Sequence, residues 1–333
     1  MKISALSITF TSKLGKTLSY FPNLHTKKLR FYVSHVMRLL LPRFLFQQRL
    51  PFVLAVLDRY HLGQINERVN YYCKLLHPFI LNNDAKTHSD LSVWNGKSAQ
   101  CLDLKQYLRY FSSRFGFYYR LGDVTTVPIV PTFLKSRPIS SENSNSVILK
   151  LNAGRFYDFP KDRLSFNEKK PIAVFRGPCH KKHRQVFIEQ TYRFPNTDIG
   201  DTRNSERLQP YYKGFMSQSD QLKYKYIISV EGNDVATNLS WIMASNSLAF
   251  IKKPKYETWF IQGVLIPDYH YVLLQDDYSD LPEKIDYYNR HTQEAIDIFT
   301  NAQKHVAQFF DHKREKLISL LVLKKYFELS GQM

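Results

Sequence analysis

The chain has 333 residues, of which 44% are hydrophobic and 15% aromatic. This composition excludes disorder, collagen-like repeats and coiled coil for the chain as a whole, and the length predicts one or two folded domains. A net charge of +18, from 47 basic and 29 acidic residues, predicts a polyanionic neighbour: nucleic acid, an anionic membrane surface or a phosphorylated substrate. Three widely spaced cysteines exclude a disulfide framework and a CxxC metal site, and favour a reducing compartment.

Half of the excess charge lies in residues 1–57, ahead of Asp58, the first acidic residue. The basic residues of this segment are Lys2, Lys13, Lys16, Lys27, Lys28, Arg30, Arg38, Arg43 and Arg49. They alternate with apolar residues, but no stretch is long enough to span a membrane and no signal-peptide pattern is present. The pattern predicts a basic amphipathic helical segment that packs as a partly buried subdomain, lies on anionic lipid, or does both. No nucleic-acid-binding signature accompanies the charge, so nucleic acid is not an expected partner.

The apolar spacing over residues 68–76 and 102–111 predicts helices, and the aromatic run 115–123 predicts a strand that ends at Gly122 and Asp123. The polar stretch 140–146 predicts an exposed loop.

Beyond Pro171 the expected strands and helices alternate, which predicts an α/β fold with a mostly parallel sheet. The expected strands are 172–177, 224–230, 248–251 and 269–274. The expected helices are 182–192, 238–245, 281–288, 292–310 and 314–329.

Common signatures of nucleotide and metal enzymes are missing from the sequence. It contains no phosphate loop, GxGxxG, GxSxG or HExxH, and no Asp-x-Asp pair of the kind that holds a metal on a nucleotide-sugar. The acidic run 276–280 is better explained as a turn that begins a helix than as a metal site. We therefore expect no metal.

Two strand-to-helix turns are candidate phosphate sites. Arg176 and Gly177 end one strand and the run 232–234 follows another, and ligands of open parallel sheets bind outside such carboxyl ends. The helix after each turn offers free N–H groups and a partial positive charge. Arg176 can contact a diphosphate with two donors, Gly232 permits close approach, and Thr237 can cap or donate a hydroxyl. An ordinary loop that turns on a glycine is the alternative for each.

Asp123 is a third candidate. It follows Gly122 at the end of an expected strand, in a neighbourhood with few other acidic residues. It is interpreted either as a turn residue or as a general base at the mouth of a cleft.

Five segments, in this order, resemble the lipopolysaccharide A protein group of glycosyltransferase family 90, to which the protein O-glucosyltransferases also belong. They are Gly122-Asp-Val-Thr-Thr-Val-Pro128, Phe175-Arg-Gly177 with Arg184, residues 224–247, Lys255-Tyr-Glu-Thr-Trp259, and one interrupted segment made of 270–272 and 277–281. The resemblance implies an α/β, GT-B-like fold with two Rossmann-like domains facing a cleft. The expected parts are the basic segment 1–57, an acceptor-side domain 58–165, a nucleotide-sugar donor domain 166–305 and a C-terminal helix 306–333.

The resemblance also implies site residues. Asp123 matches the catalytic base, and Arg176 and Gly177 match a turn that helps hold the nucleotide diphosphate. The other donor-binding residues expected are Arg184, Gly232, Asn233, Asp234, Ala236, Thr237 and Asn238. The chain departs from its eukaryotic relatives at 236–238, where they have Ser-Phe-Arg with the arginine on the phosphates. Arg176, Arg184, a nearby lysine or the helix end must then meet the phosphate charge.

The resemblance therefore implies an inverting, metal-independent hexosyltransferase. It would move glucose or galactose from a nucleotide-sugar, expected to be a UDP-hexose, to the core saccharide of lipopolysaccharide or lipooligosaccharide, without a cofactor. Asp123 would take the proton of the acceptor hydroxyl in a single displacement. Because that acceptor is anchored in lipid, we expect peripheral attachment at the cytoplasmic face of the bacterial inner membrane. The alternative is a non-catalytic protein that binds nucleic acid or anionic lipid through the same charge.

Overall fold

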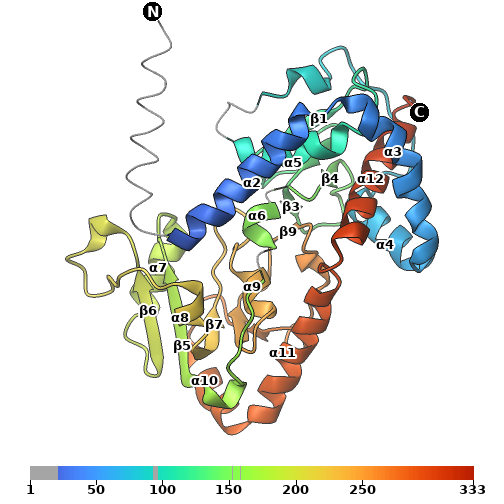
Figure 1. Cartoon of the computed structure of the whole chain (residues 1–333). Helices are drawn as coiled ribbons and strands as arrows, with labels where there is room; N and C mark the ends of the chain where they lie inside the picture. Colours follow the sequence, from blue (N-terminus) through green and yellow to red (C-terminus); the bar gives the residue numbers. More distant parts are fainter. Residues whose placement is uncertain (1–21, 93–96, 152, 158) are drawn as a thin grey trace, which may run out of the picture.

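The structure is a computed structural model that describes residues 22–92, 97–151, 153–157 and 159–333. The first 21 residues of the expected basic segment lie outside the described residues. Figure 1 shows a lower lobe around the largest sheet and an upper lobe in which helices surround a small sheet.

The lower lobe is built on a five-stranded parallel sheet in the order β10-β8-β7-β5-β6. Its strands are β5 (Lys170–Gly177), β6 (Thr197–Asp201), β7 (Tyr224–Ile228), β8 (Leu248–Ile251) and β10 (Val272–Leu273). β7 and β8 are buried at every position, which is why they are continuous apolar runs in the sequence. Numbered along the chain, the order is 2-1-3-4-5, a doubly wound arrangement whose ligand site lies at the carboxyl ends of the strands.

Helices cover this sheet. They are α7 (Lys182–Thr191), α8 (Gln218–Gln221), α9 (Leu239–Met243), α10 (Leu281–Arg290) and α11 (Thr292–Ala307). α11 shows the pattern that makes them helical, because its buried residues Ala295, Ile298, Phe299, Ala302 and Val306 recur at intervals of three or four. The helix expected over 238–245 is shorter than predicted, since α9 has only five residues.

The upper lobe contains a three-stranded parallel sheet in the order β1-β2-β4. Its strands are β1 (Tyr118–Arg120), β2 (Thr132–Leu134) and β4 (Ser146–Ile148), and its helices include α4 (Leu62–Tyr72), α5 (Ser98–Leu108), α6 (Ala153–Phe156) and α12 (His312–Leu329). α12 brings the C-terminal end of the chain back from the lower lobe to the upper lobe (Figure 1). Short 3₁₀ turns occur at Val56–Arg59, His88–Asp90, Phe166–Glu168, Asn204–Glu206 and Gln262–Val264.

The expectation of an exposed loop over 140–146 is wrong at its C-terminal end. Ser146 begins β4 and is buried, and Asn143 is buried as well. The Asn143 side chain accepts a hydrogen bond from Lys74 and donates one to the main-chain oxygen of Pro138. Composition alone places this polar residue at the surface, but these hydrogen-bond partners stabilise it in the interior.

Paired strands and shared core residues join the two lobes. β3 (Ser136–Pro138) of the upper lobe pairs antiparallel with β9 (Tyr256–Thr258) of the lower lobe. One core cluster contains residues of both lobes, including Tyr72 and Trp259, whose rings stack with centroids 3.8 Å apart. The α/β class with parallel sheets is confirmed. The upper sheet, however, has three strands of three residues each and is smaller than the sheet expected of a Rossmann-like domain.

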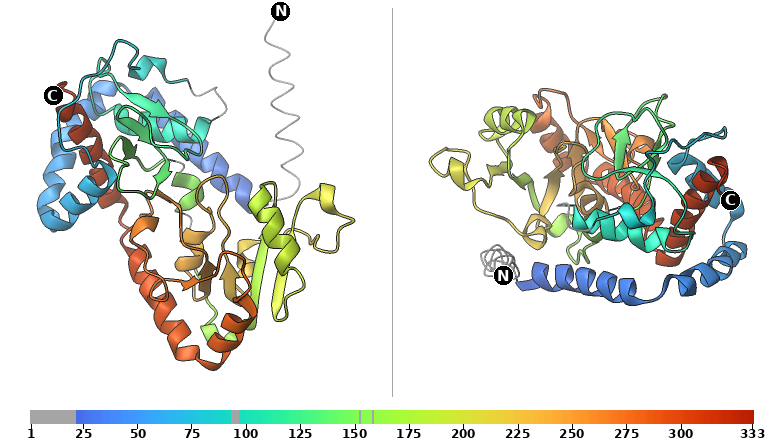
Figure 2. Two further views of the ribbon diagram at one scale, coloured as in Figure 1. Left: turned by 180° about the vertical axis from the view of Figure 1, so that it is seen from behind. Right: turned by 90° about the horizontal axis from the view of Figure 1, so that it is seen from above.

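The described part of the basic segment forms two helices, α2 (Pro22–Leu40) and α3 (Arg43–Ala55), separated at Pro42. Figure 2 shows, from above, that they run along one side of the molecule. Within the described part of the chain, no single helix is long and apolar enough to cross a bilayer. The pair Leu29–Leu40 and Arg43–Arg59 reaches that length and composition only when taken together, with a bend of 102°.

Candidate functional site

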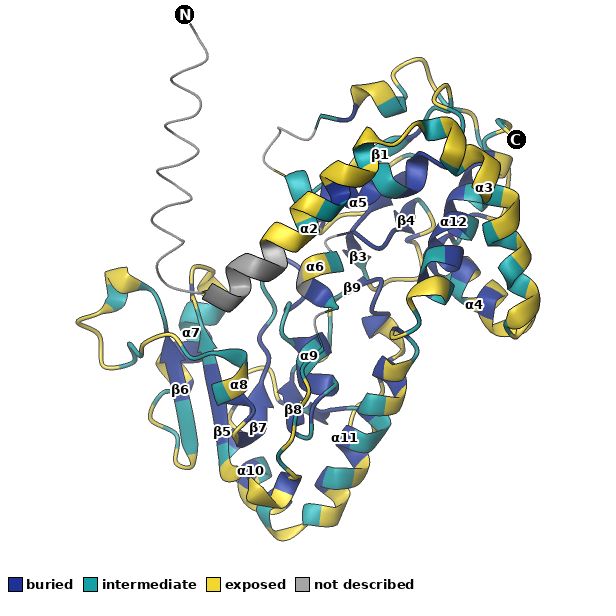
Figure 3. Cartoon of the chain, viewed as in Figure 1, coloured by how far each residue is buried: buried dark blue, intermediate teal, exposed yellow. Residues whose placement is uncertain are grey.

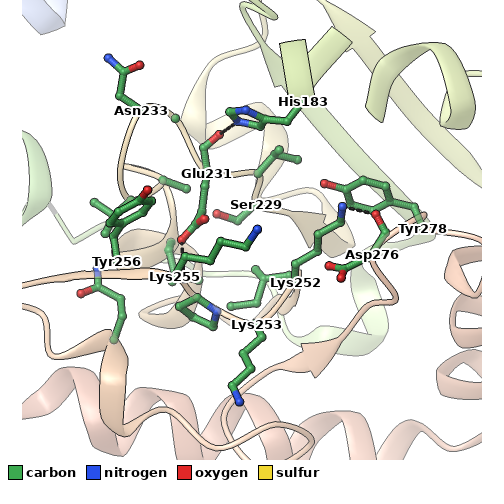
Figure 4. Close-up of a pocket in the computed structure, with 18 residues that line it drawn as sticks. His183, Ser229, Glu231, Asn233, Lys252, Lys253, Lys255, Tyr256, Asp276 and Tyr278 are labelled. Atoms are coloured by element: carbon green, nitrogen blue, oxygen red, sulfur yellow. Dashed lines mark hydrogen bonds between the residues drawn. The ribbon is translucent and has the colours of Figure 1, made fainter. Parts of the chain in front are cut away.

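A cavity of about 280 Å³ opens at the carboxyl ends of β7, β8 and β10 (Figure 4). Residues 229–233, 235–236 and 251–256 form most of its wall, with contributions from His183 of α7, Gln262 and Tyr278. A doubly wound sheet binds its ligands at this position. The volume is slightly below the usual range for small-molecule sites, about 300–1,000 Å³.

Three lysines that follow β8 are among the residues that line the cavity, and two of them extend their ammonium groups into it. Lys252 donates a hydrogen bond to the main-chain oxygen of Asp276, and its ammonium lies 3.9 Å from the centroid of the Tyr278 ring. Burial lowers the pKa of Lys252, and the nearby Asp276 carboxylate opposes this change. Figure 4 shows Lys252 and Lys255 extending between Glu231 and Tyr278, whereas the amino group of Lys253 points away from them. Ammonium groups that extend into a cavity in this way can bind phosphate oxygens.

Glu231 lies opposite these lysines. Its Oε1 accepts a hydrogen bond of 3.0 Å from the main-chain N–H of Lys255, and its main-chain oxygen is held by His183 and Arg184. Burial raises the pKa of Glu231, although the main-chain N–H groups of Lys255 and Tyr256 oppose the increase. A carboxylate in the wall of a cavity can accept hydrogen bonds from the hydroxyl groups of a sugar.

Asp123 lies at the rim of the cavity. The turn that presents it requires a glycine at 122, where φ is +108°. The Oδ1 atom of Asp123 accepts a hydrogen bond of 2.7 Å from Lys135 Nζ, and Oδ2 accepts one of 3.2 Å from Nδ2 of Asn233, a cavity-lining residue whose side chain points outward in Figure 4. Burial raises the pKa of Asp123, but the hydrogen bonds from Lys135 and Asn233 and the charge of Lys135 outweigh burial, so the pKa is lowered overall. Asp123 is therefore a carboxylate at neutral pH.

Lys135 connects the two lobes at this rim. Its Nζ lies 2.7 Å from Oδ1 of Asp123 and 2.7 Å from Oδ2 of Asp234. Only 4% of the Lys135 and Asp234 side chains is exposed, against 36% for Asp123. Ser136 also donates to Asp234, at 2.6 Å. Because Asp234 belongs to the loop after β7, this network fixes Asp123 relative to the cavity.

Three of the expected donor-site residues line the cavity: Gly232, Asn233 and Ala236. Asn238 lies just behind the wall and accepts a hydrogen bond from Ser229, and Thr237 is partly buried beside it. α9 begins only at Leu239 and has five residues, so it aligns fewer peptide dipoles toward the cavity than the expected helix would.

The expected arginines lie elsewhere. The Arg176 guanidinium, whose side chain is 7% exposed, pairs with Asp198 Oδ1 at 2.5 Å, and neither Arg176 nor Gly177 is among the cavity-lining residues of the described structure. Arg184 donates to the main-chain oxygens of Val230 and Glu231, so it supports the cavity wall from behind.

From the sequence, Lys255 is named only as the start of a family-like segment and the lysine near the phosphates is left unspecified, although a signal for all three lysines is present. Lys-Lys-Pro-Lys follows the strand 248–251 directly, and the rule that placed the loop after β7 at the site also applies there. Lys135 gives no such local signal, because its partners Asp123 and Asp234 come from distant parts of the chain.

A doubly wound sheet, a basic cavity at its strand ends and a carboxylate at the cavity rim are features of α/β enzymes that act on anionic ligands. The sequence matches glycosyl transferase family 90 over residues 158–330, and the chain belongs to this family. It is a glycosyltransferase, with a sugar donor and an acceptor as substrates.

Two relatives show how far the similarity extends. The O-glucosyltransferase LpsA of Dichelobacter nodosus is 43% identical over 310 residues, which cover 91% of this chain and 96% of that protein. The human protein O-glucosyltransferase 3 is 28% identical over 173 residues, 49% of this chain and 33% of that protein.

A solved structure is also similar in part. The C-terminal domain of a glycosyl transferase group 1 family protein (LpcC) from Francisella tularensis aligns with a TM-score of 0.34 and 14% identity, over 47% of this chain and 97% of that one.

Proposed function

We propose that the protein is an inverting glucosyltransferase that extends the core saccharide of lipopolysaccharide or lipooligosaccharide. Glucose is favoured over galactose because the relative that matches almost the whole chain is named an O-glucosyltransferase. The observation that carries the proposal is the contact between Asp123, at the rim, and Asn233, in the cavity wall. It puts a carboxylate base beside the cavity that would hold the donor.

The donor is a nucleotide-sugar, with UDP-glucose as the first candidate. Its diphosphate would contact Lys252 and Lys255, which take the place of the family arginine missing at Asn238. Glu231 would accept hydrogen bonds from ribose or hexose hydroxyl groups. Fixed cations can stabilise the charge of the departing diphosphate without a metal or a cofactor.

The reaction is a single displacement. Asp123, held as a carboxylate by Lys135 and Asn233, removes the proton from the acceptor hydroxyl. The hydroxyl oxygen attacks the anomeric carbon while the bond to the diphosphate breaks on the opposite face, so the configuration inverts. Removal of a positioned base slows such reactions by about 10²- to 10⁴-fold.

The acceptor is a saccharide anchored in lipid, and the enzyme attaches reversibly to the cytoplasmic face of the bacterial inner membrane. The net charge of +18 and the excess of basic residues before Asp58 support this location.

The test supplies the purified full chain with UDP-glucose, UDP-galactose or ADP-glucose and with a delipidated core oligosaccharide. We expect transfer from UDP-glucose, a product of inverted configuration by NMR, and an unchanged rate in EDTA. Asp123→Asn should lower the rate by about 100-fold or more. A product of retained configuration, or a fully active Asp123→Asn variant, would refute the mechanism.

The donor site has its own test in two neighbouring lysines. Lys255→Gln should weaken UDP binding about tenfold or more, since a hydrogen bond to a charged group contributes about 1.5–3 kcal/mol. Lys253→Gln is the matched control, because that side chain points away from Glu231 and Tyr278 (Figure 4). Calorimetry with UDP measures the affinity of both variants. An equal loss of affinity in the two would mean that Lys255 does not contact the diphosphate.

A further inference from the structure

Helix α2 turns an apolar side toward solvent. Leu29, Val33, Val36, Met37 and Leu40 recur at intervals of three or four residues, which puts them on one face of the helix, and all are exposed. The opposite face contacts the protein through the buried His35, whose Nε2 lies 3.4 Å from Asp103 of α5, and through Phe31, whose ring lies against that of His35. A surface helix of a soluble protein normally has polar residues on the side that faces solvent.

Exposed apolar residues continue into α3. We define the α2–α3 apolar face as Leu29, Val33, Val36, Met37, Leu40, Leu41, Phe44, Leu45 and Phe52, which are between 37% and 75% exposed. Exposed ribbon is visible along both helices in Figure 3. Such an extended set of apolar side chains on the surface marks an interaction site.

Polar bonds hold these helices to the upper lobe from the other side. Arg43 and Gln47 each donate a hydrogen bond of 2.9 Å to the main-chain oxygen of Phe111, and Arg109 donates one of 2.7 Å to that of Leu41. The apolar face is therefore held outward by specific contacts.

A groove of about 500 Å³ adjoins this face between α3 and α12. Phe52, Val53 and Val56 supply its apolar lining, and Arg49, Lys313 and Lys316 supply three positive charges. None of these six lining residues is acidic. An apolar floor beside several cations complements an acyl chain next to an anionic headgroup.

We infer that the α2–α3 apolar face and this groove dock the enzyme on an anionic lipid bilayer. The two helices lie in the interface, with the apolar side chains among the acyl chains and Arg49, Lys313 and Lys316 against lipid phosphates. The charge of the groove favours lipid over an apolar protein partner. The inference rests on the proposed function, because a lipid-anchored acceptor is the reason for the enzyme to bind a bilayer. It adds to that function the surface through which the enzyme reaches the acceptor.

The test is flotation of the full chain with vesicles of phosphatidylcholine, with and without phosphatidylglycerol. A face variant carries Val36→Gln, Met37→Gln, Leu40→Gln and Phe44→Gln. Its control carries Ile80→Gln, Ile129→Gln and Leu208→Gln, at residues at least 89% exposed that lie outside the α2–α3 apolar face. We expect the face variant to lose binding about tenfold or more, and the control to bind like the unmodified chain.

A groove variant, Arg49→Gln with Lys313→Gln, tests the charges. It should lose most of the preference for vesicles that contain phosphatidylglycerol, whereas Arg193→Gln with Arg207→Gln, two exposed arginines of the lower lobe, should keep it. Equal binding by the face variant and its control would overturn the inference. So would a dimer in light scattering that the face variant abolishes, combined with no vesicle binding, because the occupant would then be a second copy of the chain.

Transfer to a delipidated core oligosaccharide separates this inference from the proposed function. The face variant should retain that activity in full while losing transfer to acceptor embedded in vesicles. If the unmodified chain floats with vesicles but transfers nothing to either acceptor, the proposed function fails and the docking surface stands.

Discussion

Lys135 controls the charge of the residue proposed as the base. Its ammonium contacts Asp123 and Asp234 at 2.7 Å each, from a buried position between them. A lowered pKa at Asp123 means that the carboxylate persists through neutral pH and is lost only in acid. This arrangement secures the ionised base but weakens its basicity, and each carboxylate oxygen keeps a lone pair that can accept a hydrogen bond from the acceptor hydroxyl.

The first prediction concerns the pH dependence of transfer. Replacement of Lys135 by Met, combined with Asp234→Asn to avoid an unpaired buried carboxylate, should raise the pKa of Asp123. The acid limb of kcat/KM should then move to higher pH by about one unit or more, because an opposite charge at contact distance lowers a carboxyl pKa by about that amount. The pH profiles of both proteins and of Lys135→Arg, which keeps the charge, measure the change. An acid limb that stays in place would show that Lys135 does not act on the base.

The second prediction concerns Gly232, whose replacement by alanine should leave the fold intact. A Cβ at this position would lie 3.6 Å from the main-chain oxygen of Val235, an ordinary contact. Gly232→Ala should therefore change the free energy of unfolding by about 0.5 kcal/mol or less, yet weaken UDP binding about tenfold if phosphate approaches this main chain. Thermal melting and calorimetry measure the two effects.

Gly200 serves as the contrast to Gly232. A Cβ there would lie 2.5 Å from Cβ of Lys213, so Gly200→Ala should destabilise the protein without a specific effect on nucleotide affinity. Unchanged UDP affinity in Gly232→Ala would contradict the placement of the diphosphate.

At the scale of elements, the pair β5–β6 contains a charged cluster that accounts for Arg176. Asp198 of β6 accepts hydrogen bonds from Arg176 and Lys213 at 2.5 Å each and from Tyr224 at 2.8 Å. Burial raises the pKa of Asp198, but these hydrogen bonds outweigh it and lower the pKa to about 2. Arg176 thus stabilises the edge of the sheet in this structure. Its substitution should lower the stability of the protein more than its affinity for the donor.

The third prediction follows from that pKa. Since the pKa of Asp198 is depressed on folding, its contribution is present above the usual value of 3.8 and is lost as the pH falls toward about 2. The difference corresponds to about 2 kcal/mol of unfolding free energy. Asp198→Asn should lower stability at neutral pH by about that amount and flatten its dependence on pH in this acid window. Urea unfolding across the window measures it, and an unchanged slope would contradict the assignment.

The same elements show what could be predicted from the sequence. β7 and β8 were predictable because both faces are buried, which makes each strand an unbroken apolar run. β6, with the sequence Thr-Asp-Ile-Gly-Asp, was missed because it is an edge strand whose polar residues bond to neighbouring strands. β2 and β4 have three residues each, too few to show a periodicity.

Some residues of the candidate site could likewise be predicted from the sequence, and others could not. Gly232 and Asn233 could be placed because they follow a recognisable strand, and the lysines after β8 could have been placed by that rule. Lys135 and the outward side of α2 could not, because both depend on which distant segments meet. For α2, hydrophobic spacing gives the apolar face but not the direction in which that face points.

At the scale of the whole molecule, a buried ion pair ties the lobes together across β3 and β9. Arg137 Nε lies 2.7 Å from Glu257 Oε1, and both side chains are 1% exposed or less. The other Glu257 oxygen accepts hydrogen bonds from Tyr71 and from the main-chain N–H of Gly263. Arg137 also donates to the main-chain oxygens of Tyr71 and Ser146. These bonds, with the core cluster that spans both lobes, leave the cavity wall and the Asp123 turn in one rigid frame.

The last prediction tests that frame. Glu257→Gln removes the charge that compensates Arg137, and an uncompensated buried charge costs about 3–5 kcal/mol. The double variant Arg137→Met with Glu257→Met removes both charges, so its loss should be smaller than that of Glu257→Gln alone. Urea unfolding should show a single transition for the unmodified chain, because the shared core makes the lobes unfold together. Two separate transitions, or a Glu257→Gln variant as stable as the unmodified chain, would mean that the lobes are independent and that Asp123 is not fixed relative to the cavity.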